Sequence, residues 1–115
     1  MNKSTIGLTE KVIIVGNKKS VEVIARIDTG ATKSSIDSKL SEELDLGPVI
    51  GTKIVKSAHG TSTRSLVEIK ILIQDKEVKG EFSIADRSHM KYQVLIGQNI
   101  LKQGFLIDPR KNEKT

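Results

Sequence analysis

The chain contains no cysteine and no tryptophan, and its 115 residues include only two histidines, two phenylalanines and one tyrosine. Without cysteine it can form neither disulfide bonds nor thiolate metal sites. A catalytic zinc ion usually has three protein ligands, often mostly histidine. His59 and His89 with Asp86 would make such a set only on paper, because nothing in their spacing favours it. We therefore predict no metal site and no cofactor.

No apolar run approaches the 18 residues of a membrane-spanning helix, and no apolar stretch follows the first five residues as in a secretion signal. We therefore expect a cytoplasmic protein without a membrane partner. The formal net charge is +5, but part of it lies in the tails, at Lys3, Arg110, Lys111 and Lys114. With so few aromatic side chains to stack on bases, the composition argues against a nucleic-acid partner.

The chain is rich in short aliphatic segments bounded by turn residues. In the best of them Val21, Val23, Ala25 and Ile27 fall on one face of an alternating pattern, which is typical of a half-buried strand. Strands are predicted at residues 12–15, 21–27, 34–36, 53–56, 66–73, 78–85, 92–97 and 104–109, and short helices at 38–44 and 98–103. A polar turn is expected at 57–62.

This number of short strands with two short helices predicts an all-β protein built as a small closed β-barrel. The length is that of one domain. We place that domain at residues 10–109, between a flexible N-terminus at 1–9 and a basic C-terminal tail at 110–115.

The tripeptide Asp28-Thr29-Gly30 follows directly on the predicted strand at 21–27 and occurs once. An aspartic protease presents its catalytic carboxylate in this way, on an Asp-Thr-Gly at the end of an apolar strand. Thr29 supplies a hydroxyl that can bond to a second copy of the loop, and Gly30 and Ala31 are small enough for two loops to approach closely. The same tripeptide is also common in surface turns, where the aspartate accepts backbone N–H bonds.

A second segment, Leu95-Ile96-Gly97, predicts on its own only a core strand before a helix. Together with Asp28-Thr29-Gly30-Ala31 it resembles the retropepsin pattern, in which an apolar-apolar-glycine segment packs under the aspartate loop. The later Asp86-Arg87 with Met90, and the ending Phe105-Leu106-Ile107-Asp108-Pro109, are similar to the retropepsin-like family labelled ATP-dependent zinc proteases. The resemblance covers roughly residues 10–110.

The ATP and the zinc of that label do not follow from the residues, because the chain has neither a Gly-x-x-x-x-Gly-Lys-Ser/Thr loop nor a His-Glu-x-x-His motif. The resemblance implies a retropepsin-like barrel that works as a homodimer, since one aspartate loop per chain supplies only one of the two carboxylates. It implies Asp28 as the catalytic residue, Thr29, Gly30 and Ala31 as the rest of the active-site loop, Leu95, Ile96 and Gly97 as its support, and Ala58, His59, Gly60 and Thr61 as the flap over the substrate.

Two carboxylates held close together cannot both ionise, so one would keep its proton while the other activates water. The predicted function is therefore endopeptidase-like hydrolysis of peptide or glutamyl peptide bonds. The cations Lys53, Lys56 and Arg64 beside the flap either favour acidic substrates or form only a solvated strand face. The resemblance points to acidic substrates, because some members are linked to ATP-grasp ligases that add glutamate to proteins.

Two other functions remain compatible with the sequence. The chain could be a non-catalytic retropepsin-fold module that binds a peptide or protein beside an ATP-grasp ligase, or a small basic nucleic-acid binder with a steep salt dependence. The manner of dimerisation is also open. The polar N-terminus and the charged end of the chain do not look like interface strands, and the strand at 104–107 fits either an interface or the core.

Overall fold

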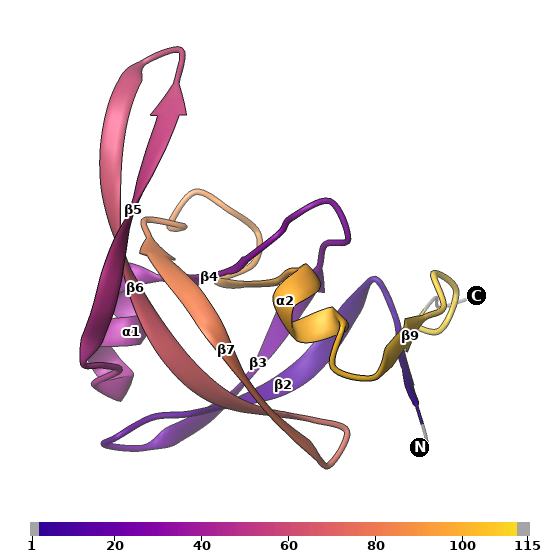
Figure 1. The fold of residues 1–115 in the computed structure, drawn as a ribbon. Coiled ribbons are helices and arrows are strands. Elements are labelled where there is room, and N and C mark those ends of the chain that lie inside the picture. Colours follow the sequence, from indigo (N-terminus) through magenta and orange to yellow (C-terminus); the bar gives the residue numbers. More distant parts are fainter. Residues whose placement is uncertain (1–2, 113–115) are drawn as a thin grey trace.

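The computed structural model describes residues 3–112 as a closed β-barrel with two short helices (Figure 1). In chain order the elements are β1 (Ser4–Ile6), β2 (Thr9–Val15), β3 (Ser20–Ile27), β4 (Ser34–Asp37), α1 (Ser38–Leu44), β5 (Val49–Ser57), β6 (Gly60–Ile73), β7 (Lys76–Ala85), β8 (Val94–Ile96), α2 (Gln98–Leu101) and β9 (Phe105–Ile107). Six strands run in the order β2-β3-β8-β4-β7-β6, and β6 pairs again with β2 to close the barrel. The predicted all-β closed barrel is confirmed.

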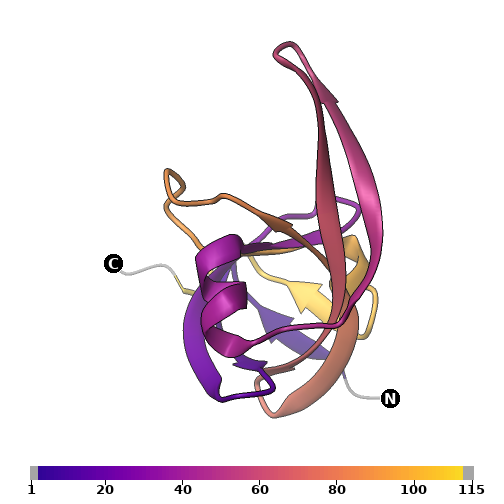
Figure 2. The same ribbon diagram turned by 90° about the vertical axis from the view of Figure 1, so that its left-hand side faces the viewer.

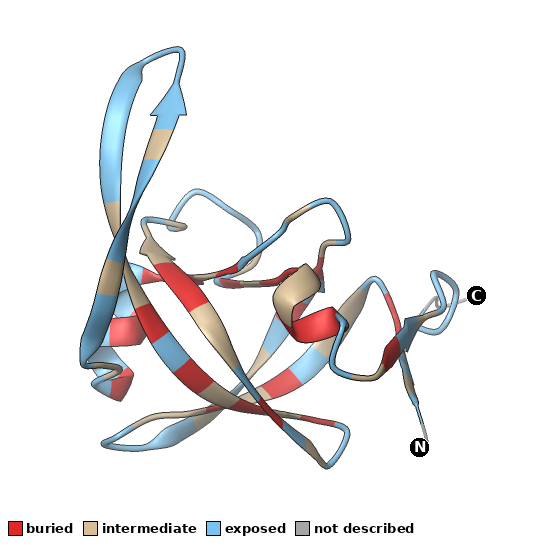
Figure 3. Cartoon of the chain, viewed as in Figure 1, coloured by how far each residue is buried: buried red, intermediate tan, exposed pale blue. Residues whose placement is uncertain are grey.

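Aliphatic side chains fill the barrel, as the alternation in the sequence predicts. In β6 the side chains of Val67, Ile69, Ile71 and Ile73 are all at most 1% exposed, and each contributes roughly 1.5–3 kcal/mol by leaving water. In β3 Ala25 and Ile27 are buried, while Val21 and Val23 pack against the core from its edge. Figure 3 shows the buried residues gathered in the barrel strands and helices.

The β5–β6 hairpin projects far beyond the barrel, as both views in Figures 1 and 2 show. It is longer than the sequence predicts, because the expected polar turn at 57–62 is mostly strand. Lys56 pairs with Thr61 and Ser57 with Gly60, so that only two residues form the turn. This ladder is solvated on both faces and therefore lacks the apolar alternation by which a strand is found in a sequence.

Helix α1 forms where it is predicted. The Asp37 carboxylate caps it by accepting from the backbone N–H of Lys39, and Leu40 and Leu44 are buried. Asp45 ends the helix in the left-handed conformation, with its N–H bonded to the carbonyl of Glu42. Helix α2 begins at the predicted residue but is only four residues long.

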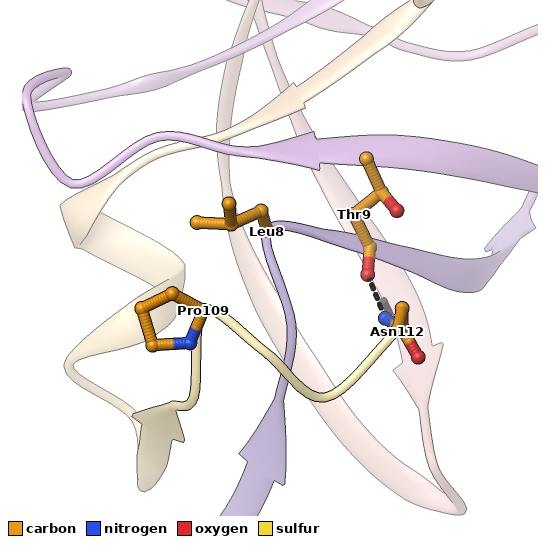
Figure 4. A pocket seen from close by; sticks show the side chains of 4 residues that line it. All are labelled: Leu8, Thr9, Pro109 and Asn112. Carbon is orange, nitrogen blue, oxygen red and sulfur yellow. Dashed lines mark hydrogen bonds between the residues drawn. The ribbon is translucent and has the colours of Figure 1, made fainter. Parts of the chain in front are cut away.

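Both ends of the described chain are bound to the barrel. The segment expected to be a flexible N-terminus contains β1, which pairs in parallel with β9, and Ile6 is fully buried. At the other end Asn112 folds back so that its side-chain amide donates to the carbonyl of Thr9, and these two residues line a pocket together with Leu8 and Pro109 (Figure 4). The rest of the expected basic tail, residues 113–115, lies outside the described residues.

Within residues 3–112, no helix is both long enough and apolar enough to span a membrane. Over the same residues, no three histidine, aspartate or glutamate side chains gather as a metal site would require. His59 lies at the exposed tip of the β5–β6 hairpin, and His89 is exposed in the connection between β7 and β8.

Candidate active site

Asp28 follows β3 and begins the loop of residues 28–33, which we call the aspartate loop. Its side chain is half-buried, and the carboxylate oxygen Oδ1 accepts from the N–H of Gly30 at 2.9 Å. Its own N–H donates to the carbonyl of Ile96 at 2.9 Å. The Asp28 carboxylate thus lies at the end of a strand, with one oxygen hydrogen-bonded within its own loop and with access to solvent.

β8 runs between β3 and β4 directly beside this loop. Ile27 pairs with Ile96 in the parallel β3–β8 ladder, and Leu95 pairs with Ser35 in the antiparallel β8–β4 ladder. Gly97 follows at the point where the aspartate loop crosses. A Cβ atom there would meet the carbonyl oxygens of Lys33 and Ala31, so the loop packs closely on the Gly97 backbone.

The first residues of α2 donate hydrogen bonds to backbone carbonyl groups of the aspartate loop. The N–H of Gln98 donates to the carbonyl of Ala31 at 2.8 Å, and its side-chain amide donates to that of Thr29 at 2.8 Å. The N–H of Asn99 donates to the carbonyl of Thr32 at 3.1 Å. Three carbonyl groups of the loop therefore have fixed donors, which leaves the loop little conformational freedom.

Asp37 is a second acidic residue near the site, but it is engaged in the structure of the chain. It is 3% exposed, and its two carboxylate oxygens accept from the N–H groups of Lys39 and Arg87. Arg87 in turn donates from Nε to the carbonyl of Tyr92. Asp37 thus caps α1 and fixes the start of the connection between β7 and β8.

Arg87 brings several charges together. Burial lowers its pKa, the Asp37 carboxylate opposes this by raising it, the cations Arg64 and Arg26 lower it further, and Asp28 raises it. An arginine remains cationic at neutral pH despite such a shift. Arg26 from β3 and Arg64 from β6 therefore lie within electrostatic range of Arg87, and so does Asp28.

We call Arg26, Arg64 and Arg87 the arginine cluster, and the carboxylates of Asp37 and Asp28 compensate part of its charge at Arg87. In the described part of the chain, none of the three forms an ion pair with an acidic side chain. Arg64 also lies directly opposite Lys53 in the β5–β6 ladder, a like-charge pairing that destabilises a sheet. An anion bound here would relieve this repulsion.

Asp86 directly precedes Arg87 in the connection between β7 and β8. Hydrogen bonds from the Ser88 side chain and backbone N–H lower the pKa of its carboxyl group. Asp86 is fully exposed, so this shift describes a local turn and not a buried reactive acid.

The residues expected to form a flap, Ala58 to Thr61, lie at the exposed tip of the β5–β6 hairpin. In Figure 1 this tip stands well apart from the aspartate loop, which emerges on the other side of the barrel top. The structure thus joins the aspartate loop to Leu95, Ile96 and Gly97, but it does not bring the hairpin tip against them.

Sequence reasoning missed several residues that the structure places at the site. Gln98 and Asn99 directly follow Gly97, and their polar side chains at the start of a helix were the available signal. Arg26 precedes the aspartate loop on the outward face of its strand. Ser34 becomes relevant only through its contact with Gly97, 63 positions away. Arg87 was named as part of the Asp86-Arg87 segment, but its contact with Asp37, 50 positions away, was not predicted.

A family model described as RimB-like, the retropepsin-like aspartic endopeptidase RimB, matches residues 38–115. The chain belongs to the RimB-like family. The description names an aspartic endopeptidase and not an ATP-dependent zinc protease. The matched segment begins after the aspartate loop, so it includes β8 and Gly97 but not Asp28. A search of curated proteins finds no significant match.

Several solved structures share the fold of this chain. Protein Lpg0085 of unknown function from Legionella pneumophila is 16% identical at a TM-score of 0.64, with 92% of this chain and 93% of that chain covered. The simian foamy virus (mac) protease is 18% identical at 0.62, with 82% and 91% covered. The EIAV protease in complex with the inhibitor HBY-793 is 19% identical at 0.64, with 82% and 84% covered. At these identities the likeness shows the retropepsin-like fold.

Proposed function

We propose that the chain is an aspartic endopeptidase that hydrolyses peptide bonds as a homodimer, with one Asp28 from each copy. The observation that carries this proposal is the placement of Asp28. Its carboxylate is half-exposed at a strand end, on a loop whose backbone is bound by Ile96, Gln98 and Asn99. A rigid carrier for one accessible carboxylate is what this chemistry needs from each subunit.

In the dimer the two Asp28 carboxylates face a shared water molecule. Because two like charges at close range cannot both persist, one carboxyl group keeps its proton and the pair titrates as a unit. The ionised group takes a proton from water as it attacks the peptide carbonyl. The protonated group polarises that carbonyl and then donates to the departing nitrogen, and no covalent intermediate forms.

A second chain supplies the second carboxylate, because among the described residues the other acid that acts on Arg87 together with Asp28 is Asp37, whose carboxylate is engaged. Asp37 cannot serve as the second catalytic carboxylate, because its two oxygens accept hydrogen bonds from backbone N–H groups of the same chain. Thr29 is exposed on the aspartate loop, where its hydroxyl can bond to the same loop of the second copy. Gly30 and Ala31 leave room for the two loops to meet.

The outer edge of β9 is a candidate contact surface for the second copy in the proposed homodimer. In the parallel register with β1, the N–H of Ser4 donates to the carbonyl of Gly104 and the N–H of Asp108 donates to the carbonyl of Ile6. These bonds use one edge of β9, so the N–H and C=O groups of Phe105 and Ile107 face the other edge. Within residues 3–112 β9 pairs with β1 alone. Leu106 on this strand is 51% exposed. We assign this edge to the second copy, which would extend the sheet.

The arginine cluster supports an acidic substrate, such as a glutamyl peptide. Among the described residues none of these three arginines forms an ion pair with an acidic side chain, Asp28 lies within electrostatic range of Arg87, and Arg64 is half-buried opposite Lys53. A substrate carboxylate entering this field would gain charge-assisted hydrogen bonds and would separate the like charges. In the closed complex the hairpin tip from Ala58 to Thr61 would move over the peptide and exclude water.

The test is to assay purified protein against an oligoglutamate peptide and a neutral peptide of equal length, with its mass in solution measured over a range of concentrations. Asp28→Asn should keep the fold and the dimer and lower the rate by on the order of 10²–10⁴ or more. Asp75→Asn, in the exposed β6–β7 turn, is the matched control. An Asp28→Asn protein that cleaves at the wild-type rate rules the mechanism out, and a protein that binds the peptides without cleaving them is a binding module instead.

A further inference from the structure

Ser34, the first residue of β4, is buried behind the aspartate loop, with 1% of its surface exposed. Its hydroxyl makes two hydrogen bonds. Oγ accepts from the N–H of Gly97 at 2.9 Å and donates to Oδ1 of Asn99 at 2.8 Å. One hydroxyl group thus orients both the glycine on which the loop packs and the asparagine that follows it.

Asn99 carries this arrangement on to β7 and back to the loop. Its side-chain Nδ2 donates to the carbonyl of Glu81 at 2.9 Å, while its backbone N–H donates to the carbonyl of Thr32. The carboxylate of Glu81 pairs with Lys33 of the aspartate loop at 2.9 Å. The contacts therefore form a closed ring that runs from Ser34 through Asn99, Glu81 and Lys33.

The ring has one buried and one exposed side. The Lys33–Glu81 ion pair has side chains 42% and 32% exposed, so water and salt weaken it. The bonds of Ser34 lie in the interior, where a lost partner leaves buried polar groups unsatisfied. The geometry of the ring therefore depends mainly on the Ser34 hydroxyl.

We propose that Ser34 is a positioning residue for Asp28, acting through Gly97 and Asn99. This inference rests on the proposed peptidase function. Without the hydroxyl, the Gly97 N–H and the Asn99 amide lose their common partner, and the first residues of α2 can shift. Those residues hold the carbonyls of the aspartate loop, so the Asp28 carboxylate would no longer stay in place opposite its twin.

The chain supplies a matched control at the next position. The hydroxyl of Ser35 is buried, and it is the one buried side-chain polar atom without a hydrogen-bond partner found among residues 3–112. Ser35→Ala removes the same atom from the same strand but breaks no bond. A difference between Ser34→Ala and Ser35→Ala therefore reports the contacts of Ser34 and not the loss of a buried oxygen.

The experiment compares wild type, Ser34→Ala, Ser34→Thr and Ser35→Ala by kcat, KM and the pH dependence of kcat on the oligoglutamate peptide. We expect Ser34→Ala to lower kcat by roughly 10- to 100-fold, with KM changed less than about twofold, because misplaced catalytic groups cost rate more than binding. Its pH profile should also shift, since the coupling of the two Asp28 carboxylates depends on their separation. Ser34→Thr should restore both.

Amide hydrogen exchange at Gly30 and Ala31 is measured on the same four proteins, relative to exchange in β6. Ser34→Ala should accelerate exchange in the aspartate loop alone, and Ser35→Ala should not. Equal kcat, pH profile and loop exchange in the two alanine variants would overturn the inference. If the wild type cleaves no peptide, the proposed function fails, and the exchange comparison alone then decides whether Ser34 orders the loop.

Discussion

A Cβ atom placed on Gly97 would lie 2.2 Å from the carbonyl oxygen of Lys33. The backbone of Gly97 has φ −102°, which any residue adopts, so glycine is required here for space and not for conformation. The aspartate loop occupies that space. The apolar-apolar-glycine segment and the Asp-Thr-Gly motif are therefore two sides of one contact, although nearly seventy positions separate them in the chain.

We expect Gly97→Ala to damage both stability and activity. The methyl group must push the loop away from α2, which should cost about 1–3 kcal/mol of unfolding free energy and on the order of 10² in kcat. Urea unfolding and peptide hydrolysis measure the two effects. Gly51→Ala is the control, because the nearest atom to its added Cβ would be Leu66 Cδ1 at 3.9 Å. Similar losses in both variants would contradict the packing argument.

An element of the fold could be predicted from the sequence where neighbouring residues determine it, and not where a partner distant in the chain does. Helix α1 and the core faces of β3 and β6 follow from local alternation and capping, and the structure confirms them. β1 has only three residues and gains its pairing from β9, a hundred positions away, so no local pattern marks it. The length of the β5–β6 hairpin was missed for a different reason. Both faces of its outer part are exposed and largely polar, so the sequence shows no apolar alternation there.

The candidate site divides in the same way. Asp28 and Gly97 belong to short motifs and could be named from the sequence. The arginine cluster draws one residue from each of three elements, and charge alone does not tell which arginines converge. Ser34 has no distinguishing feature in the sequence, since its neighbour Ser35 has the same side chain but a hydroxyl group without a hydrogen-bond partner.

A second prediction concerns the buried carboxylate of Asp37. Asp37→Ala removes the cap of α1 and the acceptor for the N–H of Arg87, so we expect a loss of roughly 2–3 kcal/mol in unfolding free energy. Asp37→Asn should also destabilise the protein, because its amide keeps one acceptor oxygen and turns a donor NH2 group toward the other backbone N–H. Asp86→Ala, which removes an exposed carboxylate bonded only to Ser88, should change stability by less than about 0.5 kcal/mol. Equal effects at Asp37 and Asp86 would show that burial does not matter here.

A third prediction tests the arginine cluster. Arg26→Gln and Arg64→Gln should each lower kcat/KM for the oligoglutamate peptide by roughly 3- to 10-fold, since each removes an ionic contact worth about 1 kcal/mol. Hydrolysis of the neutral peptide should change little. Arg87 is left intact because it also holds the Tyr92 carbonyl. Raising the salt concentration should reduce the preference for the acidic peptide in the wild type.

The matched control for this experiment is Lys79→Gln, an exposed cation on β7 whose removal changes the net charge by the same amount. It should leave the ratio of acidic to neutral hydrolysis unchanged. If Lys79→Gln reduces the preference as much as Arg26→Gln, the effect comes from the overall charge, and the cluster does not bind the substrate.

The last prediction concerns the open edge of β9. Leu106→Asp places a charge on a side chain that is 51% exposed in one copy and covered in the proposed dimer. We expect the dimer dissociation constant to rise by at least about 100-fold, since burying an unpaired carboxylate costs several kcal/mol. Activity should then depend steeply on concentration, because a monomer holds only one Asp28. Val49→Asp, at 54% exposure on β5, which does not pair with β9, should leave both measurements unchanged. Full activity from a monomeric Leu106→Asp protein would mean that one chain is catalytically sufficient. That outcome would contradict the proposed mechanism, because a single chain offers the carboxylate of Asp28, whereas Asp37 is buried with both oxygens hydrogen-bonded.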